Sequence, residues 1–254
     1  MRAVPPGDLS VPMPASSSAW SAARPPLVLV AHGSRSDAAA AVVQEIAAGA
    51  RAALPGVKVR VGYVDVRRPA VADAVRGLDG AVVLPAFLAS GYHVRTDLPA
   101  QLAEAGADPA RFVVTPALGP DPLLARAALA RLAAAGHQVG DTVVLAAAGS
   151  SDAAAVAEVR IAGKMFADAL GRGVRVGFAA TATPRIAALV DGLRRAGSER
   201  ISVVSWLLAP GVFHTRIRDS GADVVGDPLG AHPDVVAAVV ARYHAGVETR
   251  TVAA

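Results

Sequence analysis

The stretch LVLVAHGS at residues 27–34 decides the fold, because the chain repeats it as VVLAAAGS at residues 143–150. Three more pairs of stretches recur in the same order at similar spacing. They are VRVGYVD at 59–65 with VRVGFAA at 174–180, PAFLASGYH at 85–93 with SWLLAPGVF at 205–213, and PALGPDP at 116–122 with DPLGAHP at 227–233. Matched stretches in one order indicate an internal duplication. We therefore predict two homologous halves, residues 25–138 and 139–247.

Within the first half, apolar runs typical of buried strands alternate with Ala-rich stretches of helical spacing. The expected strands are 27–31, 57–66, 81–88 and 112–115, and the expected helices are 37–54, 71–76, 96–105 and 122–135. Alternating strands and helices form parallel sheets with helices on both faces. The predicted fold class is α/β, with two homologous halves that are each a parallel sheet flanked by helices.

The composition argues against several classes of protein. The chain has no cysteine, which excludes disulfides, cysteine-ligated clusters and a thiol nucleophile, and favours a cytoplasmic location. The 25 Lys and Arg residues exceed the 21 Asp and Glu residues only slightly and are scattered, so we expect no nucleic-acid partner. The chain also lacks a P-loop, a G-x-G-x-x-G string and a G-x-S-x-G string, which argues against nucleotide binding and serine hydrolysis.

The two ends of the chain are expected to lie outside the folded halves. Residues 1–24 are rich in Pro, Ser and Ala and lack the apolar stretch of a signal peptide, so we expect a disordered leader. Residues 248–254 are expected to form a tail. No stretch approaches the roughly 18 apolar residues of a membrane span, and we expect no membrane association.

Three polar residues of the first half stand where expected strands end, which is where open α/β sheets bind ligands. His32 follows the first strand, Asp65 lies near the end of the second, and His93 follows the third. Two imidazoles and a carboxylate suit Fe²⁺, Co²⁺, Ni²⁺ or Zn²⁺, and they can accept protons at neutral pH. Each residue also has an ordinary alternative, because such a His is often structural and such an Asp often caps a helix or faces solvent.

The motifs around these residues resemble those of the sirohydrochlorin chelatase family, the class II tetrapyrrole chelatases. The similarity rests on AHGSR at 31–35, an acidic residue before Pro69, and PAFLASGYHVRTDLP at 85–99. It implies a class II chelatase fold with the active cleft between the halves. It also implies a metal-insertion site made by His32, Asp65 and His93, in which the histidines hold the metal and accept pyrrole protons. Relatives often carry Glu where this chain has Asp65, which we expect to orient one imidazole or to stabilise the imidazolium.

The resemblance implies an enzyme that inserts a divalent metal into sirohydrochlorin, with Fe²⁺ and siroheme biosynthesis as the first expectation. A cobaltochelatase of cobalamin biosynthesis, a non-catalytic metal or tetrapyrrole carrier, and a periplasmic-type binding protein are the alternatives. Because the metal, Fe²⁺ or Co²⁺, is a substrate, no permanently bound cofactor is expected. With both halves in one chain, a monomer would suffice.

The same resemblance suggests which residues bind the macrocycle, a flat ring with carboxylates on its rim. Arg35 and Arg95 each follow a proposed catalytic histidine closely and are candidates for pairing with ring carboxylates. An ordinary surface charge is the alternative for each arginine. Ser34, Ser90 and Tyr92 are candidates for hydrogen bonds to the ring.

The second half departs from this pattern at each proposed site position. Ala148 stands where His32 does, and Ala180 stands where Asp65 does. Phe213 faces His93 in the ungapped alignment, with His214 one position away. The second half is therefore expected to be a degenerate repeat, which leaves one site per chain. His214 either lines the cleft or has a structural role, and His137, His232 and His244 are expected to face solvent.

Overall fold

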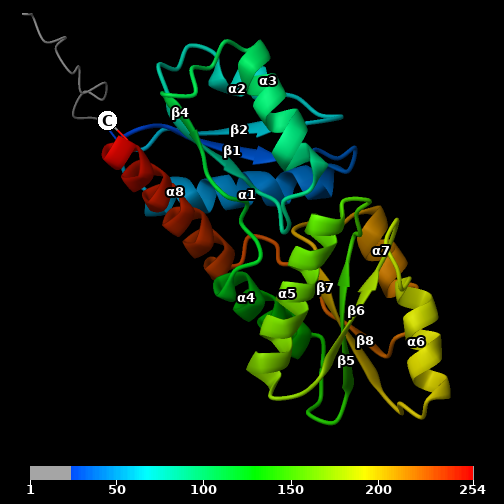
Figure 1. The fold of residues 1–254 in the computed structure, drawn as a ribbon. Helices are drawn as coiled ribbons and strands as arrows, with labels where there is room; N and C mark the ends of the chain where they lie inside the picture. The colour runs from blue at the N-terminus through cyan, green and yellow to red at the C-terminus, as the bar shows by residue number, and fades with distance from the viewer. Residues whose placement is uncertain (1–23, 254) are drawn as a thin grey trace, which may run out of the picture.

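The computed structural model describes residues 24–253, which fold into two α/β units joined side by side (Figure 1). The expected leader therefore lies outside the described residues, apart from Arg24. The first unit contains strands β1 (Leu27–Ala31), β2 (Val59–Tyr63), β3 (Ala81–Pro85) and β4 (Phe112–Val114). The second contains β5 (Thr142–Ala147), β6 (Val174–Phe178), β7 (Ile201–Trp206) and β8 (Val224–Val225).

Both sheets are parallel and have the same strand order. The first runs β2-β1-β3-β4 and the second runs β6-β5-β7-β8, so each strand has a counterpart in the other half. The ends of the strands correspond as well: Ala31 pairs with Tyr63 at the end of β1, and Ala147 pairs with Phe178 at the end of β5. The predicted fold class is confirmed, including the duplication.

The helices of the first half lie close to the predicted positions, and those of the second half follow in the same order. In the first half they are α1 (Asp37–Ala53), α2 (Val71–Val75), the π-helical turn η1 (His93–Asp97), α3 (Leu98–Glu104) and α4 (Pro122–Ala134). In the second half they are α5 (Ala153–Leu170), α6 (Ile186–Arg195), α7 (Val212–Arg218) and α8 (Pro233–Ala253). Ser36, Asp121 and Asp152 cap α1, α4 and α5 by accepting a backbone N–H in the first turn, which satisfies donors that lack an intrahelical partner.

The last helix of each repeat packs across the boundary between the halves. Helix α4 lies against β7 of the second sheet, and α8 returns to lie against α1 and β3 of the first (Figure 1). The hydroxyl of Tyr243 on α8, which is buried, donates to the carbonyl of Pro25 just before β1. One apolar core consequently includes residues of both sheets, such as Leu29 and Leu145.

Helix α8 extends into the residues that were expected to form a tail. Residues 248–253 continue the helix instead of forming a separate tail. The apolar spacing weakens after Val247, so the sequence pattern gave no sign that the helix would continue. Among the described residues, no helix is both long enough and apolar enough to cross a membrane.

Candidate metal centre

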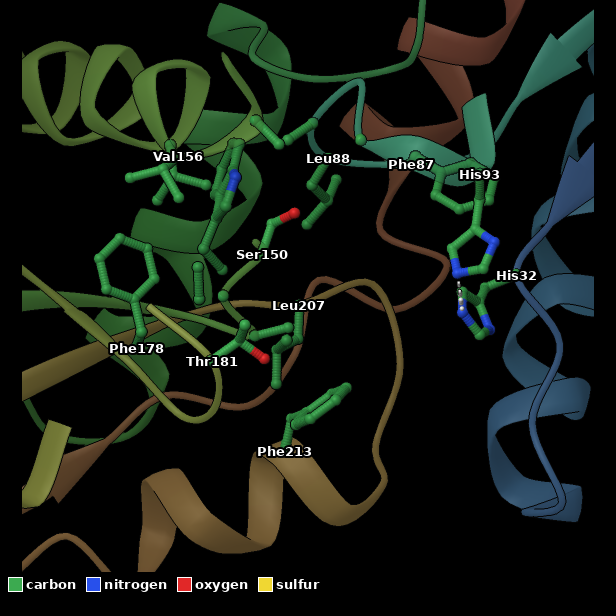
Figure 2. Close-up of a pocket in the computed structure, with 18 of the residues that line it drawn as sticks. His32, Phe87, Leu88, His93, Ser150, Val156, Phe178, Thr181, Leu207 and Phe213 are labelled. Atoms are coloured by element: carbon green, nitrogen blue, oxygen red, sulfur yellow. Dashed lines mark hydrogen bonds between the residues drawn. The ribbon is translucent and has the colours of Figure 1, made fainter. Parts of the chain in front are cut away.

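The parallel sheet of the first half brings His32 and His93 together. Strands β1 and β3 are neighbours that end at Ala31 and Pro85, so the residues that follow them leave the same edge of the sheet. The Nε2 atoms of the two histidines lie 3.0 Å apart. Their rings meet edge to face, with centroids 4.4 Å apart and an interplanar angle of 85° (Figure 2). The two histidines predicted from the sequence are therefore in direct contact.

The partners of the Nδ1 atoms define what the facing Nε2 atoms can do. His32 Nδ1 lies 3.0 Å from the carbonyl oxygen of Gly33, and His93 Nδ1 lies 2.5 Å from Oδ2 of Asp97. Both partners are acceptors, so each Nδ1 carries a hydrogen and each neutral ring has its lone pair on Nε2. Two lone pairs at 3.0 Å repel unless a proton or a metal ion lies between them.

A metal ion fits this pair geometrically. With metal–nitrogen bonds of about 2.1 Å, two nitrogens 3.0 Å apart subtend an angle of about 90° at the ion, as neighbouring ligands of an octahedral ion do. The carboxylate of Asp97 fixes the orientation of the His93 ring through its contact with Nδ1, as partners of metal-binding histidines generally do. The remaining coordination positions are open to other ligands.

The turn that carries His93 is wider than an α-helix. The N–H of Leu98 donates to the carbonyl of His93, five residues earlier, which is a π-type hydrogen bond. Pro99 has no N–H to donate to the carbonyl of Arg95, so the α-helical ladder is interrupted at this point. The helix expected to begin near Thr96 therefore begins at His93 with a π turn, a feature frequently found at functional sites. This turn places Asp97 next to the His93 ring.

The side chain of Asp65 does not contact the histidines as the sequence analysis expected. Its Oδ1 accepts a hydrogen bond of 2.7 Å from the backbone N–H of Val66, and the residue is exposed. The four ring nitrogens of His32 and His93 have other partners, so Asp97 and not Asp65 orients an imidazole. Within residues 24–253, no group of three or more His, Asp or Glu side chains is arranged to hold a metal ion. The backbone carbonyl of Asp65 nevertheless packs tightly against Gly33.

The expected ring-binding residues before α1 do not line the cleft. Ser34 Oγ accepts the backbone N–H of Ser36 at 3.1 Å, and the Ser34 carbonyl accepts from Arg67. These contacts hold the loop that follows His32. Arg35 is exposed, and the expectation that it pairs with a ring carboxylate stays a prediction.

The expected ring-binding residues near His93 contact the second half. Glu158 of α5 accepts the backbone N–H of Ser90 through Oε2 at 2.5 Å and faces Arg95 through Oε1 at 3.3 Å. Arg95 is thus already paired with Glu158, although its side chain is 47% exposed. Tyr92 is 61% exposed and lines the cleft. Ser90 uses its backbone here, not the hydroxyl proposed from the sequence.

A cavity of about 620 Å³ separates the histidine pair from the second half. The second half contributes an apolar wall, which we define as Val156, Phe178, Trp206, Leu207 and Phe213. Figure 2 shows the labelled members of this wall on one side of the cavity and His32 and His93 on the other. The cleft thus carries its histidine pair on the first half, beside apolar residues such as Phe87 and Leu88, and faces the apolar wall of the second half.

The aligned second-half positions confirm that this half lacks its own pair of histidines. Ala148 and Phe213, the counterparts of His32 and His93, both line the cleft. His214 is buried, and it is not among the residues that line this cleft. Burial lowers the pKa of His214, while Asp227 and a backbone hydrogen bond with Gly226 oppose the shift. His214 therefore has a structural role.

The other three histidines differ in how far they are exposed to solvent. His244 is exposed on α8, as expected. The expectation is wrong for His137, whose side chain is 14% exposed beside Asp141. His232 is 24% exposed, and its Nδ1 accepts the N–H of Asp234 at the start of α8.

Two acidic residues at the site were missed by the sequence reasoning. Asp97 follows His93 by four residues, which is a contact spacing within a helix, but the expected helix began too late to include both. Glu158 lies in the Ala-rich sequence of α5, where no motif marks it. Only the packing of α5 on the loop before His93 reveals its role.

Comparison with known proteins assigns the chain to a family. A family model described as CbiX matches residues 26–135 and again residues 142–245. The chain belongs to the CbiX family. This membership confirms the resemblance to the sirohydrochlorin chelatases, and the double match follows the two repeats.

Individual relatives of this CbiX family member agree in fold. The sirohydrochlorin cobaltochelatase of Methanopyrus kandleri is 38% identical over 81 residues, which are 30% of this chain and 57% of that protein. The match thus spans less than two thirds of that relative. SirB from Bacillus subtilis with Fe³⁺ superposes with a TM-score of 0.74 at 19% identity, over 87% of this chain and 94% of that one.

A third relative is the CbiX described as the terminal enzyme for biosynthesis of siroheme in denitrifying bacteria. It superposes with a TM-score of 0.67 at 27% identity, over 87% of this chain and 98% of that one. Its structure therefore matches both halves of the present chain.

Proposed function

We propose that this protein is a chelatase that inserts Fe²⁺ into sirohydrochlorin in siroheme biosynthesis. The observation that carries the proposal is the pair of facing Nε2 atoms, 3.0 Å apart, at the edge of a cleft with an apolar far wall. Such a pair can hold a divalent ion by two bonds and release it. A ring that stacks against the apolar wall would present its nitrogens to that ion.

The charges and protons of the reaction balance at this site. Insertion exchanges one divalent ion for two pyrrole N–H protons. As the ion moves to the ring, the lone pairs on the Nε2 atoms of His32 and His93 become free to accept those protons. Asp97 holds the His93 ring in place through Nδ1, and His32, which is exposed, can pass its proton to water.

The macrocycle would be held mainly by the second half. A flat aromatic ring gains from burial against Phe213, Phe178 and Leu207, because apolar surface leaves water and ring faces stack. Its rim carboxylates would stay near Tyr92, which lines the cleft and is 61% exposed. The exposed side chains of Arg35 and Arg95 are the candidate cations for them. The first half would supply the metal and the second half the surface on which the ring lies.

The choice of metal rests on the relatives, because two imidazoles suit Fe²⁺ and Co²⁺ alike. The relative described as the terminal enzyme of siroheme biosynthesis matches 87% of this chain, which favours iron. The Methanopyrus kandleri protein is described as a cobaltochelatase and covers only 30% of this chain. Cobalt insertion is therefore the second candidate function.

The test is an anaerobic assay of the purified protein with sirohydrochlorin and Fe²⁺ or Co²⁺, followed by visible absorbance against protein-free controls. We expect both ions to be inserted faster with the protein than without it, and Fe²⁺ to have the higher kcat/KM. A higher value for Co²⁺ would move the proposal to the cobalt pathway. Stoichiometric binding of ring or metal without acceleration would overturn the chelatase proposal in favour of a carrier.

A further inference from the structure

We propose that Glu158 is a positioning residue that holds the His93 loop against the second half and so sets the width of the slot for the ring. This inference rests on the proposed function and deepens it. Glu158 lies on α5 of the second half, whereas its partners Ser90 and Arg95 lie on the loop and turn that follow β3 of the first half. One carboxylate thus bridges the two walls of the cleft.

The contacts of Glu158 are specific. One carboxylate oxygen accepts a short hydrogen bond of 2.5 Å from the Ser90 N–H, and the other faces the Arg95 guanidinium at 3.3 Å. The Glu158 side chain is 23% exposed. A charged acceptor strengthens a hydrogen bond to a backbone N–H roughly twofold over a neutral one, so removal of this side chain leaves the loop without its strongest tether to α5.

The position of Glu158 connects it directly to the cleft. Val156, within the same turn of α5, lines the cavity, as do Tyr92 and His93 on the tethered segment. A Cβ atom placed on Gly91 would lie 3.7 Å from the Cβ of Ala155 and 3.8 Å from Oγ of Ser150. The loop and α5 therefore already touch, and the Glu158 hydrogen bonds fix them in this contact.

His32, His93 and Asp97 all belong to the first half, so the metal pair does not require Glu158 for its own geometry. The ring, in contrast, must fit between the first-half loop and the second-half wall. A loop that is no longer held must be ordered when the ring binds, and this ordering weakens binding. Loss of Glu158 should therefore raise the KM for the ring while leaving the affinity for the metal alone unchanged.

The kinetic test compares Glu158→Ala and Glu158→Gln with a control, Asp168→Ala, on the same helix. Asp168 pairs with Lys164 within α5 and does not reach the first half. We expect Glu158→Ala to raise the KM for sirohydrochlorin about tenfold, since a charge-assisted hydrogen bond contributes about that factor. The kcat and the Co²⁺ affinity measured by titration without ring should stay near the wild-type values.

Glu158→Gln retains an acceptor for the Ser90 N–H, so it should recover part of the loss, and Asp168→Ala should match the wild type. If Glu158→Ala does not fold, Glu158→Gln still tests the proposal. It removes the charge that pairs with Arg95 and should raise the KM for sirohydrochlorin by a smaller factor. An unchanged KM in both Glu158 variants, or a loss of metal affinity equal to the loss of ring affinity, would overturn the proposal.

A second measurement needs no catalysis and so separates this inference from the proposed function. The chain has no cysteine, and the spacing between Gly91 and Ala155 suits a disulfide. The double substitution Gly91→Cys and Ala155→Cys should oxidise readily, as followed by thiol titration, and more slowly when Glu158→Ala is added. Equal oxidation rates would show that Glu158 does not hold the loop, whether or not the protein inserts metal.

Discussion

The acceptors of the two Nδ1 atoms differ in charge, and this difference gives the two histidines different roles. His93 faces the carboxylate of Asp97 at 2.5 Å, whereas His32 faces the neutral carbonyl of Gly33 at 3.0 Å. A hydrogen bond to a carboxylate is stronger than one to a neutral carbonyl. The orientation of the His93 ring is thus fixed more firmly, whereas the His32 ring is exposed to water.

Substitution of Asp97 by Asn tests this assignment. The amide forms a weaker hydrogen bond with Nδ1 than the carboxylate does. It can also turn its NH₂ group toward Nδ1, which would move the hydrogen to Nε2. We expect Asp97→Asn to lower metal affinity or kcat about 10- to 100-fold, measured by Co²⁺ titration and by product absorbance. Asp65→Asn is the matched control, because its amide oxygen can still accept the Val66 N–H, and we expect little change. A greater loss for Asp65→Asn would return the acidic role to Asp65.

At the scale of elements, the loops that follow β1 and β5 have the same backbone but different chemistry. Gly33 has φ +99°, and an added Cβ would lie 1.9 Å from the carbonyl oxygen of Asp65. Gly149 has φ +95°, and an added Cβ would lie 2.0 Å from the carbonyl oxygen of Ala180. The duplication therefore preserved the loop geometry while the second half lost its histidine.

This pair of loops offers a matched test. Gly33→Ala and Gly149→Ala should both lower the melting temperature, because each forces a left-handed backbone and a steric overlap, at a cost of more than about 1 kcal/mol. Only Gly33→Ala should also weaken Co²⁺ binding, since it displaces the residue next to His32. The two variants can be compared by thermal unfolding and metal titration. Equal metal affinity in both would contradict the assignment of the site to the first half.

A buried carboxylate at the start of the second sheet gives a pH-dependent prediction. Burial raises the pKa of Asp141, but hydrogen bonds from Ser202, the Gln138 N–H and Arg200 outweigh burial and lower it to about 2. The folded-state pKa lies below the ordinary value of 3.8, so this stabilisation is present above about pH 4 and is lost as the pH falls toward 2.

We expect Asp141→Asn to reduce the free energy of unfolding at pH 7 by about 2 kcal/mol. The difference from the wild type should shrink as the pH falls from 4 to 2. Urea unfolding at several pH values measures it. A difference that does not change with pH would mean that the charge of Asp141 does not stabilise the fold.

Sequence patterns located the strands and most helices of the first half because each element keeps its own apolar period, and the repeated stretches extended this order to the second half. Strand β1 was predicted at its observed bounds, and α1 was predicted within one residue. The start of the His93 helix was missed because a π turn has no apolar period of its own. The same turn brings Asp97 to His93, so one error in an element boundary hid a residue of the site.

For the whole molecule, the sequence did not reveal that α4 packs on the sheet of the second half and α8 on the sheet of the first. The helix at 122–135 was predicted within the first repeat, and periodicity does not say which sheet a helix covers. In the structure α8 covers the first sheet and α4 packs on the second. The boundary of the repeats near residue 138 therefore differs from the boundary between the packed units, and the cleft lies between two units that share a core.

This packing of α4 and α8 predicts that neither repeat folds alone. A fragment of residues 24–138 would lack α8 and leave apolar residues of β1 and β3, including Leu29 and Leu84, without their cover. We expect this fragment and the fragment of residues 139–253 to be unfolded or aggregated when expressed singly, and to form a folded complex when co-expressed. Circular dichroism and size-exclusion chromatography would show it. A stable, monomeric single fragment would contradict the shared core.

The most direct test of the central claim is the rate of metal insertion by His32→Ala, His93→Ala and the double variant, measured anaerobically with sirohydrochlorin and Fe²⁺. If the two Nε2 atoms act as one unit on one ion, each single substitution should lower kcat/KM by about 100-fold or more. The double substitution should add little, because residues that act as a unit are strongly non-additive. Rates near wild type in either single variant, or small losses that multiply in the double variant, would contradict the paired-imidazole site.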